Sequence, residues 1–128
     1  MSRVFVPQEA VRRSRTNDRL EPLFSLEPAR EFGEIEICLQ ANATHGNYDL
    51  DAVIDCLKDR LSTYTSDDYI LLGGNLGVLA LAVMLASEFN GGHVRLLSWE
   101  KVPGRYRVLD VSLAEALPHL FQDQIYDH

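Results

Sequence analysis

The sequence predicts an α/β fold with a single, mainly parallel sheet, flanking helices and an antiparallel hairpin at one edge, in a Rossmann-like arrangement. Short apolar runs and longer runs of helical periodicity follow one another in the order β-β-α-β-α-β-β. Residues 67–113 carry most of this pattern, because an apolar run, a glycine turn, a longer apolar run, a second glycine turn and two strand-like runs occur in succession. A chain of 128 residues has the size of one domain, so we treat residues 1–128 as a single unit.

The first thirty residues predict a strand and then an arm. Residues 3–6 are strand-like and end at Pro7, whose missing N–H favours an edge position in the sheet. Residues 7–30 are mostly polar, include Pro28 and lack sustained periodicity. We therefore expect an extended N-terminal loop or arm there, which wraps a surface or binds a partner.

The middle of the chain predicts two strands and two helices. Alternating Glu and Ile in residues 34–39 are typical of a strand with one buried face. Apolar side chains recur at helical spacing over residues 50–61, and Asp49 precedes them as a candidate N-cap. Residues 69–72 are apolar on both faces, which favours a central strand. Residues 76–89 predict an Ala-rich helix that is apolar on nearly all sides and therefore needs more than one covering surface.

The last third predicts a hairpin and a short helix. Residues 94–99 and 106–111 are strand-like and flank Pro103-Gly104, a pair that suits a hairpin turn. The preceding strand, helix and strand imply a parallel pair with a right-handed connection. Residues 113–126 are expected to form a short helix interrupted at Pro118.

Length and composition argue against several classes of protein. The apolar run at residues 76–86 is far shorter than the ~20 residues that cross a bilayer, and the N-terminus lacks the pattern of a secretory signal. We therefore expect a cytoplasmic protein that binds no membrane. Cys38 and Cys56 have neither metal-ligand nor redox-pair spacing, so two free, buried thiols are expected.

The net charge of −7 is unevenly distributed along the chain. Residues 1–30 contain six Arg and four acidic residues, which gives +2, and the remaining residues carry −9. Because an acidic body repels phosphate, nucleic-acid binding through the folded body is not expected. The mildly basic arm could contact an acidic partner, although a solvated segment explains the same composition.

The glycine turn after residues 69–72 is the first candidate ligand site. Gly73, Gly74 and Asn75 lie between a predicted strand and a predicted helix, where backbone N–H groups can hold an anion. The loop after residues 34–39 should end at the same edge of the sheet, which would bring Thr44 and His45 close to the turn. No P-loop or dinucleotide fingerprint is present, and a tight βα turn needs glycine for geometry alone.

The predicted edge hairpin is the second candidate site and would bind a protein partner. Trp99 and Tyr106, with Arg95, Arg105 and Arg107, give it an aromatic and basic character. Cross-strand aromatic and Arg pairs on an exposed sheet face are an equally simple explanation.

The sequence contains no catalytic or metal motif. The G-x-S-x-G elbow of serine hydrolases is missing and the histidines are scattered. His45 with Asp49 and Asp51 would offer three metal ligands from one loop without a second histidine, which is a poor site. We therefore expect no metal, no cofactor and no enzymatic activity.

Two segments resemble short uncharacterised proteins encoded by tailed bacteriophages. They are the opening M-S-R-V-F-V-P-Q-E, residues 1–9, and residues 68–113, in which G-G-H-V-R-L-L-S-W precedes a Tyr-containing strand. The resemblance implies a viral source and the cytoplasm of a host cell. A fainter similarity links the glycine turn to Rossmann-like nucleotide-sensing domains of prokaryotic defence systems. Leu72 and Asn75 differ from the Thr and the basic residue that flank the glycine pair in those domains.

These observations favour a small phage-type accessory protein without catalytic machinery that binds a protein partner, either a host factor or another phage component. Two alternatives remain open. The first is a small-ligand module that binds a nucleotide or an anion at the glycine turn. The second is a structural component of the virion. Self-association through the apolar C-terminal segment is compatible with each of them.

Overall fold

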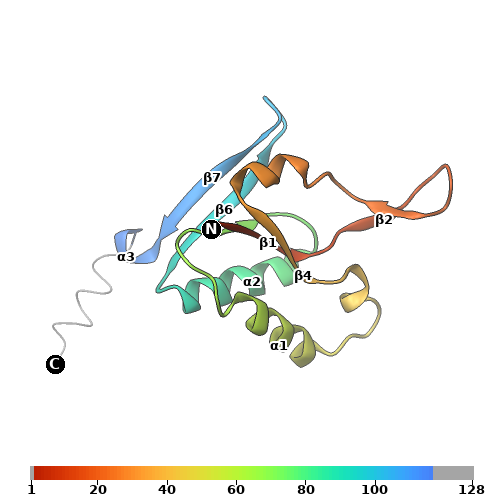
Figure 1. Cartoon of the computed structure of the whole chain (residues 1–128). Helices are drawn as coiled ribbons and strands as arrows, with labels where there is room; N and C mark the ends of the chain where they lie inside the picture. The colour runs from red at the N-terminus through yellow and green to blue at the C-terminus, as the bar shows by residue number, and fades with distance from the viewer. Residues whose placement is uncertain (1, 117–128) are drawn as a thin grey trace, which may run out of the picture.

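The computed structural model describes residues 2–116 and confirms the predicted α/β fold. One mostly parallel sheet contains five strands in the spatial order β4-β1-β5-β6-β7 (Figure 1). These strands are β1 (Arg3–Gln8), β4 (Glu34–Leu39), β5 (Tyr69–Leu71), β6 (His93–Glu100) and β7 (Arg105–Ser112). The first four strands of the spatial order run parallel, and β7 pairs antiparallel with β6. The element order β-β-α-β-α-β-β of the main sheet is therefore as predicted.

Two capped helices cover one face of the sheet. Helix α1 (Leu50–Leu61) begins after Asp49, whose carboxylate accepts hydrogen bonds from the backbone N–H groups of its first turn. Helix α2 (Leu76–Phe89) begins after Asn75, whose Oδ1 accepts from the Val78 N–H at 3.1 Å. The two helices pack side by side beneath the sheet in Figure 1, and each buries one apolar face against it. No helix within residues 2–116 has the length and apolar character to cross a bilayer.

Residues 7–30, expected to form an extended loop or arm, contain short regular elements. Strands β2 (Val11–Arg13) and β3 (Leu20–Pro22) form a separate antiparallel hairpin that projects from the body, and the 3₁₀ helix η1 (Glu27–Phe32) follows (Figure 1). Residues between β3 and β4, among them Phe24 and the fully buried Ala29, pack against the face of the sheet opposite α1 and α2. Each of these elements is too short to show periodicity in the sequence.

The expectation that the first strand lies at an edge was wrong. Strand β1 lies between β4 and β5, and its residues from Val4 to Gln8 are all buried. Pro7 is tolerated because β5 pairs with β1 only at Val4 and Phe5, so no neighbouring strand on that side needs a hydrogen bond from Pro7. The edge positions belong to β4 and β7.

The predicted hairpin is confirmed and is longer than expected. Strands β6 and β7 pair over eight residues each, from His93 opposite Ser112 to Glu100 opposite Arg105. Gly104, with φ +90°, occupies the turn in a conformation that favours glycine. A short helix α3 (Leu113–Ala116) follows β7. The remainder of the predicted C-terminal helix, including the interruption at Pro118, lies outside the described residues.

Candidate functional site

Three segments that are distant in the sequence form one pocket where β5 ends. We call it the aromatic pocket, and its volume is about 390 Å³. Its lining residues come from the covering segment after β3, from the turn between β5 and α2, and from the β6–β7 hairpin: Phe24, Ser25, Pro28, Leu72, Gly73, Gly74, Trp99 and Tyr106. The structure thus brings the predicted glycine turn and the predicted aromatic residues of the hairpin together in a single site.

The aromatic wall of the pocket is a cross-strand pair. Trp99 on β6 lies directly opposite Tyr106 on β7, and their ring centroids are 5.0 Å apart in an edge-to-face arrangement. Trp99 remains 46% exposed, whereas Tyr106 is buried. Burial raises the pKa of the Tyr106 phenol, so it stays neutral near pH 7. The wall is therefore aromatic, uncharged and open on the Trp99 side.

The glycine turn forms the base of the pocket and is packed directly against the segment after β3. A Cβ atom on Gly73 would lie 3.0 Å from Cζ of Phe24, which is closer than carbon atoms normally approach. Gly74 has φ +86°, a conformation that other residues rarely adopt. A side chain at position 73 would be too close to Phe24, and one at position 74 would be strained by the backbone conformation, so both positions favour glycine. The backbone of both glycines lines the pocket.

The other predicted ligand residues do not line the aromatic pocket. Thr44 belongs to the 3₁₀ helix η2 (Ala41–Thr44), and its hydroxyl is hydrogen-bonded to the buried side chain of Gln8, with Gln8 Nε2 donating at 3.0 Å. Because β1 separates β4 from β5, Gln8 lies between Thr44 and the glycine turn. Asn75 uses its Oδ1 to cap α2, and His45 is exposed.

The predicted partner-binding residues separate into three locations. Arg105 and Arg107 flank Tyr106 along β7, so their side chains project to the opposite face of the hairpin. Arg95 stacks its guanidinium 3.9 Å from the centroid of the Tyr69 ring, and its Nε donates to the Asp68 carbonyl at 3.4 Å. Only Trp99 and Tyr106 of the predicted set belong to the pocket.

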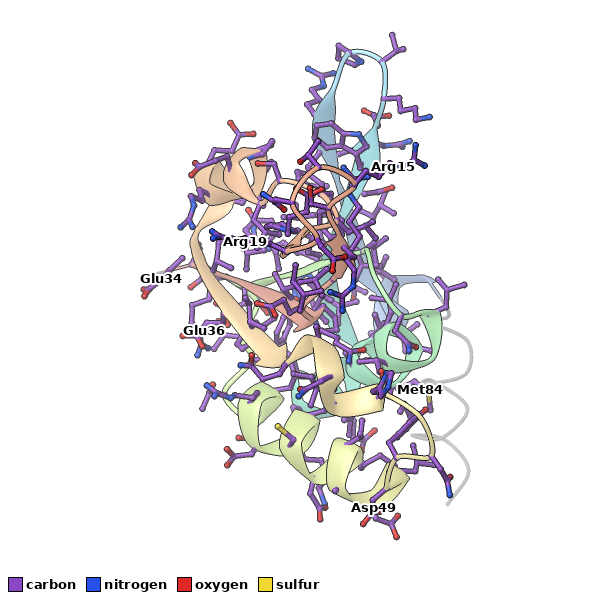
Figure 2. The ribbon with its side chains drawn as sticks, turned by 90° about the vertical axis from the view of Figure 1, so that its right-hand side faces the viewer. Arg15, Arg19, Glu34, Glu36, Asp49 and Met84 are labelled. Carbon is purple, nitrogen blue, oxygen red and sulfur yellow. The ribbon has the colours of Figure 1, made fainter. Side chains whose placement is uncertain are left out.

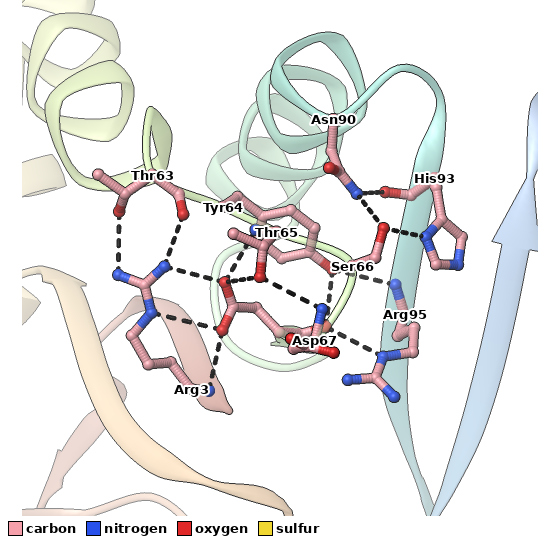
Figure 3. Close-up of polar contacts among 10 residues, drawn as sticks. Arg3, Thr63, Tyr64, Thr65, Ser66, Asp67, Asn90, His93 and Arg95 are labelled. Carbon is pink, nitrogen blue, oxygen red and sulfur yellow. Dashed lines mark hydrogen bonds and ion pairs between the residues drawn. The ribbon is translucent and has the colours of Figure 1, made fainter. Parts of the chain in front are cut away.

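A buried ion pair at the amino-terminal ends of β1 and β5 was missed in the sequence. The Asp68 side chain is only 1% exposed, and its carboxylate accepts hydrogen bonds from the backbone and guanidinium of Arg3 and from the backbone and hydroxyl of Thr65. Arg3 also donates to the hydroxyl and carbonyl of Thr63 (Figure 3). Burial alone would raise the pKa of Asp68, but the hydrogen bonds from Arg3 and Thr65 outweigh it and lower this pKa. No local pattern indicated this pair, because Arg3 lies beside Asp68 only when β1 is a central strand next to β5.

The sequence also gave no indication of a chain of polar contacts around His93. Its Nδ1 lies 2.8 Å from the Ser66 hydroxyl and its Nε2 lies 2.7 Å from Oδ1 of Asp110, an order of groups that resembles a Ser-His-Asp relay. Figure 3 shows Ser66 between Asn90 and His93, and the Asn90 amide donates to the Ser66 hydroxyl and to the His93 carbonyl. Both amide hydrogens are thus engaged, and Asp110 is 60% exposed. The arrangement links the loop before β5, the end of α2 and the hairpin.

Potential metal ligands and thiols are dispersed. Among the described residues, no group of three or more His, Cys, Asp or Glu side chains is arranged to hold a metal ion. Both cysteines are free. Cys38 is buried as expected, but Cys56 is only half-buried, with its Sγ 3.4 Å from the Cys38 carbonyl oxygen.

Comparison with known proteins identifies a family. The family model described as "Phage Pam3 gp32-like protein" matches residues 2–113, which confirms the predicted similarity to phage-encoded proteins. Comparisons with curated proteins and with solved structures gave no match. Because the match extends over most of the chain and includes every strand that builds the aromatic pocket, the protein belongs to the phage Pam3 gp32-like family.

Proposed function

We propose that this phage protein is a non-enzymatic accessory protein that binds a protein partner through the aromatic pocket. The observation that carries the proposal is the half-exposed Trp99, which forms an aromatic wall with Tyr106 beside a pocket whose base is the glycine turn. Exposed Trp and Tyr residues beside a preformed pocket are the side chains that most often dominate protein binding energies. A host factor or another phage component would supply the opposing side chain.

The chemistry of the pocket favours an apolar side chain of that partner. None of the eight lining residues is charged, and Ser25 and Tyr106 provide the only side-chain hydroxyl groups. A volume of about 390 Å³ accommodates one or two large side chains. We therefore expect the partner to insert an aromatic or aliphatic residue between Phe24 and Trp99.

Affinity capture with matched variants tests the proposal. Lysates of uninfected and phage-infected host cells are passed over immobilised protein, and bound proteins are identified by mass spectrometry. Trp99→Ala should reduce recovery of the partner by tenfold or more, because it removes the exposed wall of the pocket. Leu20→Ala, on β3 and 65% exposed, is the control and should recover the partner fully. Equal recovery by Trp99→Ala, or no enriched protein in either lysate, would refute the proposal.

Fluorescence provides a direct second readout. Trp99 is the only Trp in the chain, so its emission reports on the pocket alone. A purified partner that binds there should shift this emission to shorter wavelength, because the ring loses contact with water. A partner that binds without changing the emission would contact another surface.

A small ligand is the second candidate, and it is supported by the exposed backbone of Gly73 and Gly74 at the start of α2. A nucleobase or another flat ring would stack on Trp99, and an anionic group of the same ligand would bind the backbone N–H groups of the glycine turn. Thermal-shift screening against nucleotides and cyclic oligonucleotides tests this idea. A hit should disappear in Gly74→Asp and persist in Gly91→Asp, since both glycines have positive φ and only Gly74 lies in the pocket.

Virion association and cellular location need separate measurements. Mass spectrometry of purified particles would detect a structural component, and fractionation of infected cells tests the cytoplasmic location that we propose for an accessory protein.

A further inference from the structure

The β2–β3 hairpin concentrates positive charge on a projection of an otherwise acidic protein. Residues 11–22 contain four Arg and two acidic residues and therefore carry +2. Because the whole chain carries −7, the remaining residues carry −9. The hairpin stands out from the body in Figure 1, and none of its residues lines the aromatic pocket. Its chemistry is thus separate from that of the proposed partner site.

Two of the four arginines are not neutralised by a neighbouring side chain. Arg12 and Arg13 each pair with an acidic residue of the hairpin, with N–O distances of 3.1 and 3.6 Å. Among the described residues, Arg15 and Arg19 form no ion pair, and both are exposed. Figure 2 views the hairpin from its end and shows these two residues on either side of the tip. Two unpaired guanidinium groups are therefore presented where the hairpin extends farthest from the body.

A defined loop carries these two arginines. The backbone N–H of Ser14 donates to the Arg19 carbonyl at 2.8 Å, and the N–H of Arg19 donates to Oδ1 of Asn17 at 3.0 Å. The hydroxyl groups of Ser14 and Thr16 lie 3.0 Å apart. Residues 14–19, which we call the hairpin tip, contain no apolar side chain. Guanidinium, hydroxyl and amide groups are the side-chain groups that proteins use to bind phosphate in DNA.

We propose that the hairpin tip binds the phosphate backbone of double-stranded DNA. All basic residues of the hairpin are Arg, whose planar guanidinium matches the geometry of a phosphate group. A two-stranded ribbon also fits into the major groove of B-DNA, whereas the narrow major groove of an RNA duplex excludes side chains.

The composition of the hairpin argues against two other acidic ligands. Single-stranded nucleic acid is held largely by stacking on aromatic side chains, and residues 11–22 include none. An acidic protein would match the charge of the hairpin tip. However, binding energy between proteins comes mostly from buried aromatic and Arg anchors in well-packed pockets, and the tip offers no apolar surface around its arginines. Contacts to a DNA backbone need no such surface.

The acidic body does not prevent contact at the hairpin tip. Thr16 lies five positions beyond Val11, so at ~3.3 Å per residue it extends up to ~17 Å from the start of β2. This distance is about twice the Debye length of ~8 Å at physiological ionic strength, so the charge of the body is largely screened at the tip. The same charge keeps the body away from DNA and restricts the contact to the hairpin.

Salt dependence measures the number of phosphate contacts. Each contact contributes about −0.9 to the slope of log K against log salt concentration, so Arg15 and Arg19 together give about −1.8. Affinity should then fall about twelvefold between 50 and 200 mM salt. We expect weak binding without sequence preference, with a dissociation constant on the order of 0.1 mM at 50 mM salt.

Fluorescence anisotropy of a labelled duplex of about 20 base pairs, titrated with the full chain, tests the proposal. Arg15→Gln/Arg19→Gln should weaken binding at 50 mM salt by more than tenfold, because it removes both unpaired charges. Arg105→Gln/Arg107→Gln is the matched control, since it removes two exposed arginines from β7, and it should change the affinity by less than about twofold. Thermal unfolding checks that both variants are folded.

A variant with increased binding provides a test that loss of folding cannot imitate. Asp18→Asn frees Arg13 from its ion pair, and Asn tolerates the φ of +56° at this position. The affinity at 50 mM salt should rise by about tenfold, and the slope should become steeper by about 0.9.

Several results would overturn the proposal. They are the absence of duplex binding at about 1 mM protein, an equal loss of binding in the β7 control, and unchanged binding by Asp18→Asn. Tighter binding of a single strand of the same sequence would contradict recognition of the duplex. Binding of labelled poly-glutamate but not of DNA would indicate an acidic protein as the ligand, which also overturns the proposal.

Discussion

Replacement of Asp68 by Asn should strongly destabilise the fold. The substitution keeps the size of the side chain but removes the charge that Arg3 neutralises at 2.9 Å. Asp68 is 1% exposed and Arg3 is 27% exposed, so the pair is shielded from water on one side and partly hydrated on the other. Breaking a fully buried pair costs about 3–5 kcal/mol. Because Arg3 is partly hydrated and keeps its hydrogen bonds to Thr63, we expect the lower limit, about 3 kcal/mol.

Urea and thermal unfolding, followed by Trp99 emission and circular dichroism, measure this cost. For 128 residues, an unfolding entropy of about 2.1 cal/mol/K per residue converts about 3 kcal/mol into a decrease in Tm of ~11 °C. Asp67→Asn is the matched control, since Asp67 is the exposed neighbour and its loss should change the Tm by no more than ~2 °C. If Asp68→Asn changed the Tm no more than Asp67→Asn does, the ion pair would not stabilise the fold.

The pH dependence provides an independent check on the same residue. The pKa of Asp68 is lowered in the folded protein, so its contribution is fully present above the unfolded pKa of about 3.9 and is lost as the pH falls through the folded pKa. The stability difference between the native protein and Asp68→Asn should therefore be constant from pH 7 to 5 and become smaller below about pH 4. A difference that widened on acidification would contradict the lowered pKa.

Three further predictions concern other parts of the molecule. Gly33→Ala should destabilise the fold by about 2 kcal/mol or more, because its Cβ would lie 2.5 Å from the Ser2 carbonyl oxygen. Gly46→Ala also places alanine at a positive φ, +66°, but meets no atom within 4 Å, so in the same urea titration it controls for backbone strain and should lose less stability. Burial raises the pKa of Cys38 to about 12, so this thiol should not react with iodoacetamide at pH 8 until the protein unfolds. Mass spectrometry measures the alkylation, and rapid labelling of the native protein would refute the burial of Cys38. We expect no hydrolysis of activated esters by the purified protein. If the native protein hydrolysed such an ester and Ser66→Ala did not, the contact between Ser66 and His93 would be catalytic.

The helices and strands that repeat a local pattern were predictable from the sequence. The spacing of apolar residues defined α1 and α2, and the cap Asp49 was recognised because a cap and its helix are adjacent in the chain. The glycine turn and the β6–β7 hairpin were identified for the same reason. Each of these features depends on interactions between residues a few positions apart.

Features that depend on strand order were not predictable in the same way. Arg3 and Asp68 are 65 positions apart and meet only because β1 lies beside β5. The aromatic pocket joins Phe24 to Gly73 and Trp99, and no local pattern connects these residues. The pocket therefore contains part of each predicted site, while the predicted residues Thr44 and Asn75 serve other contacts and His45 is exposed.

The position of β1 explains why the segment after β3 had to be part of the fold. Parallel strands are almost always covered on both faces, and α1 and α2 lie on the same face of this sheet. Among the described residues, the segment between β3 and β4 covers Val4, Val6 and Leu71 on the second face, through Ala29 and Phe24. Because Phe24 also touches Gly73 and lines the aromatic pocket, the residues that close the core shape the proposed binding site as well. Loosening of this segment should therefore alter both the stability of the sheet and the pocket.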